Sequence, residues 1–361
     1  MKKKILYFMH VDWHWIKQRP HFLAEQLSVD FDMLVAHPYS NRRSHLVRNE
    51  TSLFRVPMLS LPLSRFKFID FINRCAKSLQ FWALFLAFRP SIVWFTFPTM
   101  VPQFGLNLLK DTLIIYDCMD DAPEFTSVEA VKQDILRKEK FLISYAKLIV
   151  VSSENLYKKI AERGAGINKL TLVRNAFGGE INDVNDLRTV EKGIGDTFRI
   201  LYFGAVSDYL DFELLLHALN NFEGVEFHFF GPITTDIPAH RGLHFHGPIS
   251  HFDLMKRAMG FDCFLMPFIV NELIQGVDPV KLYEYINLNK NIICPHYNEI
   301  NRFSEFVSFY RNEEEFLLIV KKLMLNNVLK YNSEQRLGFL EMNCWPVRVT
   351  EVTKSINYLL Q

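Results

Sequence analysis

ILYFM (residues 5–9) and RILYF (residues 199–203) are two short apolar runs, and each one opens a series of runs of the same kind. Longer segments with helical periodicity separate the runs in both halves of the chain. Such alternation is typical of parallel β-sheets covered by helices. The sequence therefore predicts an α/β protein made of two sequential, doubly wound halves of similar size.

The predicted strands and helices divide the chain into four parts. The strands are 5–9, 31–36, 91–95, 113–116, 147–151 and 171–173 in the first half, and 199–203, 226–230, 243–246, 263–266 and 291–294 in the second. We expect a Rossmann-like first domain at 1–177, a polar, glycine-bearing linker at 178–197, a Rossmann-like second domain at 198–342, and a helix at 343–361 that packs back on the first domain.

Composition narrows the class of protein. Of the 361 residues, 49% are hydrophobic and 22% are charged, and the formal net charge of +1 argues against a nucleic-acid partner. Residues 1–90 carry 14 Lys/Arg against six Asp/Glu, so the first half is basic and the rest is acidic. The five cysteines are scattered without a CxxC pair, which predicts reduced thiols and a cytoplasmic protein.

The longest apolar stretches are short. The run at 5–9 is too brief for the core of a signal peptide, and the run at 81–88 is far below the roughly 20 residues that cross a bilayer. We expect no membrane span.

Glycines follow two strands of the second half. Gly204 follows 199–203 and Gly231 follows 226–230. Ligands of open α/β sheets bind beyond the carboxyl ends of the strands, where a glycine lets backbone amides approach a phosphate. A plain tight turn remains an alternative at both places, and neither segment matches the GxGxxG pattern of dinucleotide folds.

The segment Asp278-Pro279-Val280-Lys281-Leu282-Tyr283-Glu284-Tyr285 is the strongest local signal. Asp278 is predicted to cap a helix that begins at Pro279, with Lys281 in its first turn and Glu284 on the same face. A lysine for a diphosphate and a carboxylate for ribose hydroxyls suit a nucleotide-sugar. An ordinary Lys–Glu surface pair is the alternative.

These motifs together resemble bacterial GT-B glycosyltransferases, in particular teichuronic-acid and exopolysaccharide transferases of the glycosyltransferase family 4 type. KLYEY (281–285) followed by NKNIIC (289–294) is similar to their K-x-x-E-Y-x-x-x-G-K-P-V-V element. Their other elements are matched, in the same order, by Asp12-Trp13, QRPHFLA (18–24), YDCMDD (116–121), VVSS (150–153), VRNA (173–176), Phe203-Gly204 and LMPF (265–268).

The resemblance implies a GT-B fold, with two Rossmann-like domains facing each other across a cleft. It implies that Glu284 holds the ribose of the donor and Lys281 its diphosphate. The sequence departs from the family in two places, because residues 205–210 contain no cation and Gly276 stands where retaining members have a second glutamate. Retention or inversion of the anomeric configuration therefore stays open. The candidate donor-binding residues are Gly204, Asp208, Gly231, Asp278, Lys281, Leu282, Glu284 and, in support of Lys281, Arg174.

The candidate catalytic residues follow strands of the first half. An inverting reaction needs a base for the acceptor hydroxyl, and Asp12, His14, Asp120 and Asp121 are the candidates. Asp120 and Asp121 are adjacent carboxylates, so one of them could have a raised pKa. Capping by one aspartate and packing of His14 among aromatics are the alternatives. No cluster has metal-ligand spacing, and GT-B transferases generally work without a divalent ion, so we expect no metal and no cofactor.

The helix at 65–77 mixes basic and large aromatic residues. It could lie on the anionic inner face of the cell membrane, or be a core helix with a solvated basic edge. The predicted function is transfer of a hexosyl group from a nucleoside-diphosphate sugar, with a UDP-sugar as the expected donor, to a lipid-linked or growing polysaccharide acceptor in capsule, O-antigen or exopolysaccharide synthesis. A sugar-nucleotide epimerase and a non-catalytic sugar-binding subunit of a polysaccharide assembly complex are the alternatives.

Overall fold

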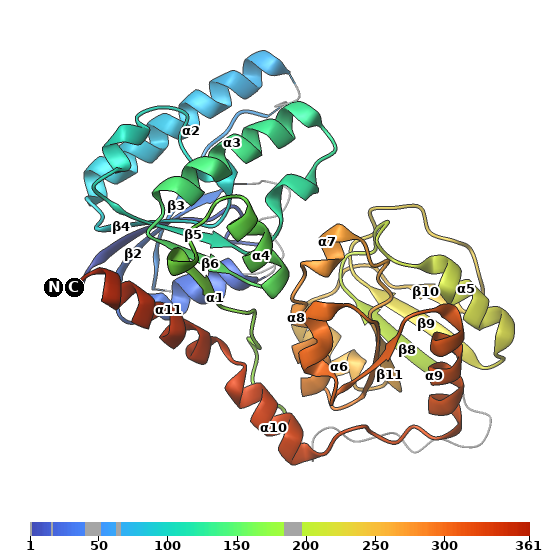
Figure 1. The fold of residues 1–361 in the computed structure, drawn as a ribbon. Helices are drawn as coiled ribbons and strands as arrows, with labels where there is room; N and C mark the ends of the chain where they lie inside the picture. The colour runs from blue at the N-terminus through green and yellow to red at the C-terminus, as the bar shows by residue number, and fades with distance from the viewer. Residues whose placement is uncertain (1, 16, 40–51, 63–65, 184–196) are drawn as a thin grey trace. The chain divides into compact units, whose positions relative to one another are not determined.

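The structure is a computed structural model that describes residues 2–15, 17–39, 52–62, 66–183 and 197–361. The chain forms two compact units (Figure 1). Unit 1 contains Met1–Ala176 and Trp345–Gln361, and unit 2 contains Phe177–Cys344. Most of the predicted linker, including Gly193 and Gly195, lies outside the described residues.

The sheet of unit 1 has seven parallel strands in the order β3-β2-β1-β4-β5-β6-β7. Its strands are β1 (Lys4–Phe8), β2 (Asp32–Pro38), β3 (Phe54–Met58), β4 (Ile92–Phe95), β5 (Leu113–Cys118), β6 (Leu148–Val151) and β7 (Leu170–Leu172). The order reverses between β1 and β4, so a crevice for a ligand is expected beyond the carboxyl ends of these two strands.

Both faces of this sheet are buried, as parallel strands require. On one face Leu6 and Phe8 pack with α2 (Lys67–Phe88), α3 (Glu129–Tyr145) and α4 (Glu154–Glu162). On the other face Ile5 and Tyr7 pack with α1 (Arg19–Leu27) and α11 (Trp345–Leu359). Successive side chains of a strand point to opposite faces, which explains why neighbours in β1 belong to different cores.

The sheet of unit 2 has six parallel strands in the order β10-β9-β8-β11-β12-β13. Its strands are β8 (Phe198–Phe203), β9 (Val225–Phe230), β10 (Leu243–Phe245), β11 (Cys263–Leu265), β12 (Asn291–Pro295) and β13 (Val307–Tyr310). Its helices are α5 (Phe212–Asn221), α6 (His251–Ala258), α7 (Glu272–Gln275), α8 (Val280–Asn287), α9 (Glu313–Leu325) and α10 (Ser333–Met342). The order reverses between β8 and β11. The prediction of two doubly wound α/β halves is confirmed.

Some helix starts follow from local chemistry. The Ser153 side chain accepts a hydrogen bond from the Leu156 backbone N–H, which confirms the predicted cap of α4. Asp211 and Ser250 cap α5 and α6 in the same way. Each cap satisfies one of the backbone N–H groups that a helix start leaves unpaired.

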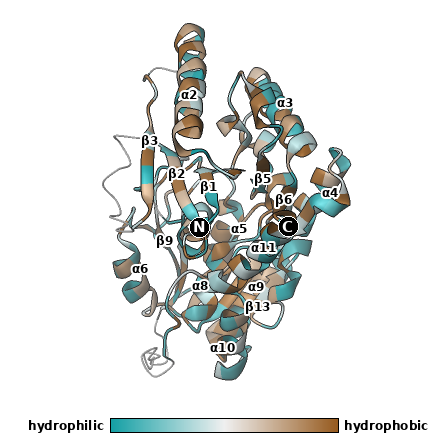
Figure 2. Cartoon of the chain, turned by 90° about the vertical axis from the view of Figure 1, so that its left-hand side faces the viewer, coloured by the Kyte–Doolittle hydropathy of each residue, from teal (hydrophilic) through white to brown (hydrophobic). Residues whose placement is uncertain are grey.

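Helix α2 carries a row of exposed apolar side chains. Phe66, Phe68 and Phe71 are 51%, 73% and 63% exposed, and Leu79 and Leu86 are also exposed. Figure 2 shows brown, hydrophobic stretches along the ribbon of α2. The helix is therefore not simply a core element with a polar outer edge.

Candidate functional site

The turn after β8 and the start of α8 meet at the point where the strand order of unit 2 reverses. The ammonium Nζ of Lys281 lies 5.7 Å from the ring centroid of Tyr202 and 5.8 Å from that of Phe268. Tyr202 belongs to β8, and Phe268 follows β11. A cation is thus held beyond the two strands between which ligands of open α/β sheets bind.

Gly204 leaves room for this lysine. Its φ of 139° is unfavourable for other residues, and a Cβ at this position would overlap Cε of Lys281 and lie 2.9 Å from its Nζ. Gly231, with φ 148°, comes so close to Gly204 that a Cβ there would overlap the Gly204 carbonyl. Only glycine fits the crossing of these two turns.

The N–H groups of Gly204 and Gly231 themselves have partners within the fold. The Gly204 N–H donates to the Phe230 carbonyl at 2.8 Å, and the Gly231 N–H donates to the Gly247 carbonyl at 2.9 Å. Amides that already have partners within the fold do not cradle a phosphate. Gly204 instead leaves room for the lysine side chain, and the approach of other amides of these turns to a phosphate stays a prediction.

Lys281 lies in the first turn of α8, as predicted, and is half-buried. Burial lowers the pKa of its ammonium, and the nearby Glu284 carboxylate partly offsets this. A half-buried cation beside a helix start has less water to stabilise it than an exposed one, and a bound diphosphate would add counter-charge to that of Glu284.

Glu284 has a partner that the sequence did not suggest. Its Oε1 lies 2.9 Å from Nε2 of His251, the first residue of α6. The hydrogen bond to Glu284 raises the pKa of His251, against the effect of burial. Glu284 is therefore held by a histidine from the neighbouring element, in addition to the charge of Lys281. The signal available in the sequence was a histidine, His251, directly after the helix cap Ser250.

Three further predicted donor residues have other surroundings. Asp278 does not occupy the N-cap of α8, because the helix begins at Val280 with Pro279 at its N-cap, and the Asp278 carboxylate is bound by Arg302. Leu282 is fully buried in the core of unit 2, so its side chain cannot contact a ligand. Asp208 is exposed on the turn after β8.

Arg174 belongs to unit 1, where its guanidinium donates to Glu154 at 2.7 Å. Its predicted support of Lys281 stays a prediction, because the two residues lie in different units.

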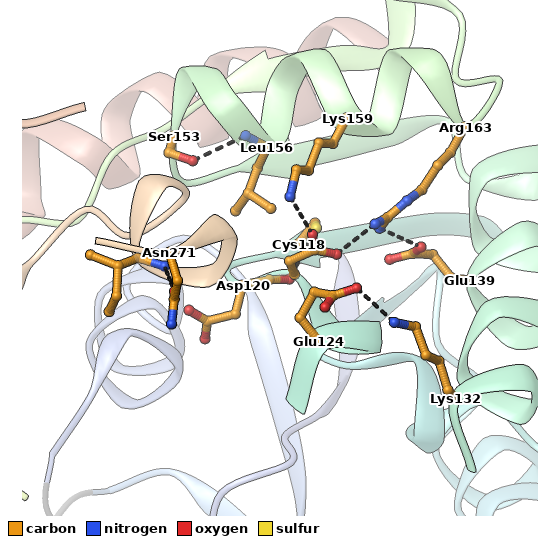
Figure 3. Close-up of polar contacts among 12 residues, drawn as sticks. Cys118, Asp120, Glu124, Lys132, Glu139, Ser153, Leu156, Lys159, Arg163 and Asn271 are labelled. Atoms are coloured by element: carbon orange, nitrogen blue, oxygen red, sulfur yellow. Dashed lines mark hydrogen bonds and ion pairs between the residues drawn. The ribbon is translucent and has the colours of Figure 1, made fainter. Parts of the chain in front are cut away.

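Asp120 (Figure 3) and Asp121 both lie in the loop after β5, but their pKa values are shifted in opposite directions. Burial raises the pKa of Asp120 to about 7, and the carboxylates of Asp117 and Asp121 add to this against the opposing effect of Arg19. Asp121 is buried, but its pKa is lowered because hydrogen bonds and charge from Lys159 and Arg163 outweigh burial. The predicted raised pKa is confirmed for one member of the pair, with burial rather than like charge as the main cause.

A network of charged side chains, of which Figure 3 labels Lys159, Arg163 and Glu139, holds Asp121 in place. Lys159 and Arg163 donate to its two oxygens at 2.9 and 2.6 Å. Arg163 also donates to Glu139 of α3 at 2.9 Å, and Glu139 accepts from the Tyr116 hydroxyl at 2.9 Å. The network joins β5, α3 and α4, so the loop that carries Asp120 is fixed from three elements.

Arg19 forms a second buried ion pair under the same loop. Its Nη2 lies 2.8 Å from Oδ1 of Asp117, and its Nη1 donates to the Val173 carbonyl at 2.7 Å. Asp117 is fully buried at the end of β5. The sequence showed both residues within family motifs, but their pairing depends on chain segments 98 residues apart.

Asp12 and His14 follow β1 and contact each other. Oδ1 of Asp12 accepts from the His14 backbone N–H at 3.0 Å and lies 3.3 Å from its Nδ1. His37, at the end of β2, lies 3.8 Å from the same oxygen. Asp12 is buried, whereas His14 is partly exposed. His10, which follows β1 directly, lies 2.8 Å from the Thr96 hydroxyl beyond β4, at the reversal point of this sheet.

No protein-family model matches the chain, and no curated protein matches it in sequence. Its fold, in contrast, is similar to solved structures over nearly the full length. Sucrose-phosphate synthase from Thermosynechococcus elongatus aligns at a TM-score of 0.74 and 11% identity, covering 99% of each chain.

Two further structures agree with it. The lipopolysaccharide outer core galactosyltransferase WaaB aligns at a TM-score of 0.63 and 12% identity, covering 98% of this chain and 99% of that one. HepE from Anabaena, in complex with UDP-glucose, aligns at 0.63 and 13%, covering 99% of each. The chain therefore has the GT-B fold of solved glycosyltransferases.

Proposed function

We propose that the protein is a glycosyltransferase that uses a nucleoside-diphosphate sugar as donor, with UDP as the nucleotide. The observation that carries this proposal is Lys281, a half-buried cation at the reversal point of unit 2, with Glu284 one turn later. The fold supports it, since HepE with the same fold binds UDP-glucose.

Unit 2 would bind the donor. Lys281 would neutralise the diphosphate, which leaves with the electron pair of the broken bond to the anomeric carbon. Glu284 would accept hydrogen bonds from the ribose hydroxyls, with His251 fixing its orientation. The cation is a preorganised partner for charge that develops as the bond breaks.

Unit 1 would supply the base of an inverting transfer. Asp120 would take the proton of the acceptor hydroxyl while the oxygen forms its bond to the anomeric carbon. A pKa of about 7 suits this role, because the carboxylate is then a stronger base than an ordinary aspartate and is still ionised near neutral pH. Asp121, held by two cations, would position the loop.

Titration calorimetry with UDP and UDP-glucose tests the donor site. Lys281→Ala should weaken binding about tenfold to a hundredfold, the range for one contact with a charged group. Glu284→Gln should weaken UDP more than inorganic diphosphate, because it removes the ribose contact. Lys321→Ala, an exposed lysine of α9, is the matched control. Unchanged affinity in both site variants, with wild-type binding intact, would refute the assignment.

The acceptor would be a lipid-linked or growing polysaccharide in capsule, O-antigen or exopolysaccharide synthesis, reached at the inner face of the cell membrane. Among the described residues, none of the helices has the length and apolar character of a membrane span. The exposed aromatic residues of α2 support contact with a bilayer surface instead.

An epimerase of sugar nucleotides is the second candidate, because a putative UDP-N-acetylglucosamine 2-epimerase has the same fold. Incubation with UDP-sugars alone separates the two. A transferase releases UDP only when an acceptor or water takes the sugar. An epimerase instead yields a UDP-sugar in which the sugar has changed. A non-catalytic subunit of an assembly complex would show neither product.

A further inference from the structure

Three histidines and a glutamate gather on one face of the sheet edge in unit 2. The pairing of β9 with β10 sets His244 directly opposite His228, and their rings stack with centroids 4.5 Å apart. The ring of His246, which follows β10, also stacks on the ring of His228, with centroids 5.3 Å apart. Glu226 lies two residues before His228, on the same face.

The ligand atoms of this cluster converge. Nε2 of His228 lies 3.2 Å from one carboxylate oxygen of Glu226, and Nε2 of His244 lies 3.7 Å from the other. One ligand atom from each of Glu226, His228 and His244 lies within 4.8 Å of the other two. Tetrahedral Zn²⁺ with bonds of about 2.0–2.1 Å spaces its ligand atoms roughly 3.3 Å apart, which is close to these separations. To aim both nitrogens at one ion, the rings of His228 and His244 must turn out of their stack.

Two details of the hydrogen bonding fit an ion. Nε2 of His244 is buried and makes no hydrogen bond. Nδ1 of His228, the nitrogen turned away from Glu226, lies 3.0 Å from Nε2 of His246. Histidines that bind metals usually pass their second ring N–H to such a partner, which fixes the tautomer and orients the ring.

We propose that Glu226, His228 and His244 bind one zinc ion, with His246 orienting His228. Two imidazoles and one carboxylate are a donor set that zinc accepts, with water in the fourth position. This site is separate from the glycosyl-transfer function proposed above and does not depend on it.

The ion would fasten the edge of the sheet. β10 has three residues, stands at the end of the strand order, and pairs with β9. A bridge from Glu226 and His228 of β9 to His244 of β10 would hold this short strand in register. The strand leads to Gly247, whose carbonyl accepts a hydrogen bond from the Gly231 N–H.

Zinc titration of chelator-treated protein without a polyhistidine tag tests the site. Wild-type protein should bind one zinc per chain, and its unfolding midpoint should rise with zinc concentration. His228→Ala and His244→Ala should abolish both effects. His246→Ala should keep the stoichiometry of one but weaken the affinity about tenfold to a hundredfold. Substitution by Co²⁺ should give the visible absorption of a tetrahedral nitrogen and oxygen site.

His217→Ala is the control, because His217 is exposed and paired with Glu313 outside the cluster. It should bind zinc like the wild type. Melting curves in chelator show that each variant is folded, and Glu226→Gln replaces any variant that is not. Absence of stoichiometric zinc binding in the wild type, or equal binding by His228→Ala, His244→Ala and wild type, would overturn the proposal. UDP binding, measured in parallel, tests the donor site independently.

Discussion

Lys281 can occupy its position because residue 204 is a glycine and has no side chain. The turn after β8 passes under the lysine at Gly204, and the adjoining turn at Gly231 is in contact with the Gly204 carbonyl. The result is a half-buried ammonium group in the space that a side chain at position 204 would otherwise fill. Three positions far apart in the sequence thus act as one binding feature.

Gly204→Ala is expected to impair donor binding through Lys281. A methyl group at this position would overlap Cε of the lysine and push the ammonium away from Tyr202. The positive φ of 139° adds backbone strain of about 1–2 kcal/mol. Calorimetry with UDP should show a loss of affinity at least comparable to that of Lys281→Ala.

Gly224→Ala is the matched comparison for this variant. Gly224 also has a positive φ, of 73°, but a Cβ there would meet nothing within 4 Å. It should lose stability by a similar amount and keep wild-type affinity for UDP. If both alanine variants bound UDP equally well, the link between Gly204 and the lysine would be disproved.

Asp120→Asn is expected to lower the transfer rate and raise stability at the same time. An asparagine cannot accept the acceptor proton, so kcat should fall about a hundredfold to ten-thousandfold. The wild-type rate should rise with pH and reach half its maximum near pH 7, because burial raises the pKa of Asp120 to about 7 and the base must be ionised.

The stability of the protein should change with pH in the direction opposite to the rate, because ionised Asp120 is unfavourable in the fold. The folded pKa of about 7 lies above the ordinary value of an unfolded aspartate, so the favourable contribution of the protonated form is complete below about pH 4 and is lost as the pH rises through 7. Asp120→Asn should therefore melt above the wild type at pH 8, and the difference should shrink towards pH 4. A pH-independent rate together with an active Asp120→Asn variant would exclude Asp120 as the base.

At the scale of single elements, α2 differs most from an ordinary surface helix. Its basic character is weaker than the sequence suggests, because Arg74 pairs with Asp70 and Asp134, and Lys77 is half-buried. The aromatic residues at its start remain exposed. Insertion of aromatic side chains, more than charge, would then drive contact with a bilayer.

Phe68→Ser combined with Phe71→Ser is expected to reduce binding to vesicles that contain phosphatidylglycerol. Full burial of an apolar side chain of this size contributes about 1.5–3 kcal/mol, so two losses should lower the bound fraction at least tenfold. Co-sedimentation measures it. Phe252→Ser, with an equally exposed phenylalanine on α6, is the control and should bind like the wild type. Equal binding by all three proteins would exclude α2 as the contact.

At the scale of the whole molecule, the chain crosses from unit 1 to unit 2 and returns. The returning helix α11 completes the core of unit 1, where Trp345 stacks on Phe22 with ring centroids 5.3 Å apart. Trp345 is 2% exposed. Unit 1 therefore depends on residues that the chain supplies last.

Trp345→Ala is expected to destabilise unit 1 by about 3–5 kcal/mol, the usual cost of removing a large buried aromatic side chain. UDP affinity should stay unchanged, because Lys281, Glu284 and His251 belong to unit 2. Calorimetric unfolding with and without UDP measures both quantities. Loss of UDP binding under conditions where unit 2 is still folded would contradict this division of roles.

Two strands that the sequence did not predict lie at the edges of their sheets. β3 and β13 are the outer strands of their sheets, and β3 contains Pro57 and the exposed Phe54. An edge strand has a neighbour on one side only and therefore needs no continuous apolar run, although the edge strands β7 and β10 were predicted. Helix α10 was missed because its apolar residues are few and Gly338 interrupts its pattern.

The sequence by itself determined the alternation of strands and helices, the two doubly wound halves, and the places of Gly204, Lys281 and Glu284 after their strands. These features depend on periodicity and on neighbours along the chain. Only the tertiary structure decided that the pKa of Asp120 is raised while that of Asp121 is lowered, and that Glu226, His228 and His244 converge. A pKa depends on burial and on charges brought from distant segments, and a ligand set across two strands depends on their register, which no local pattern contains.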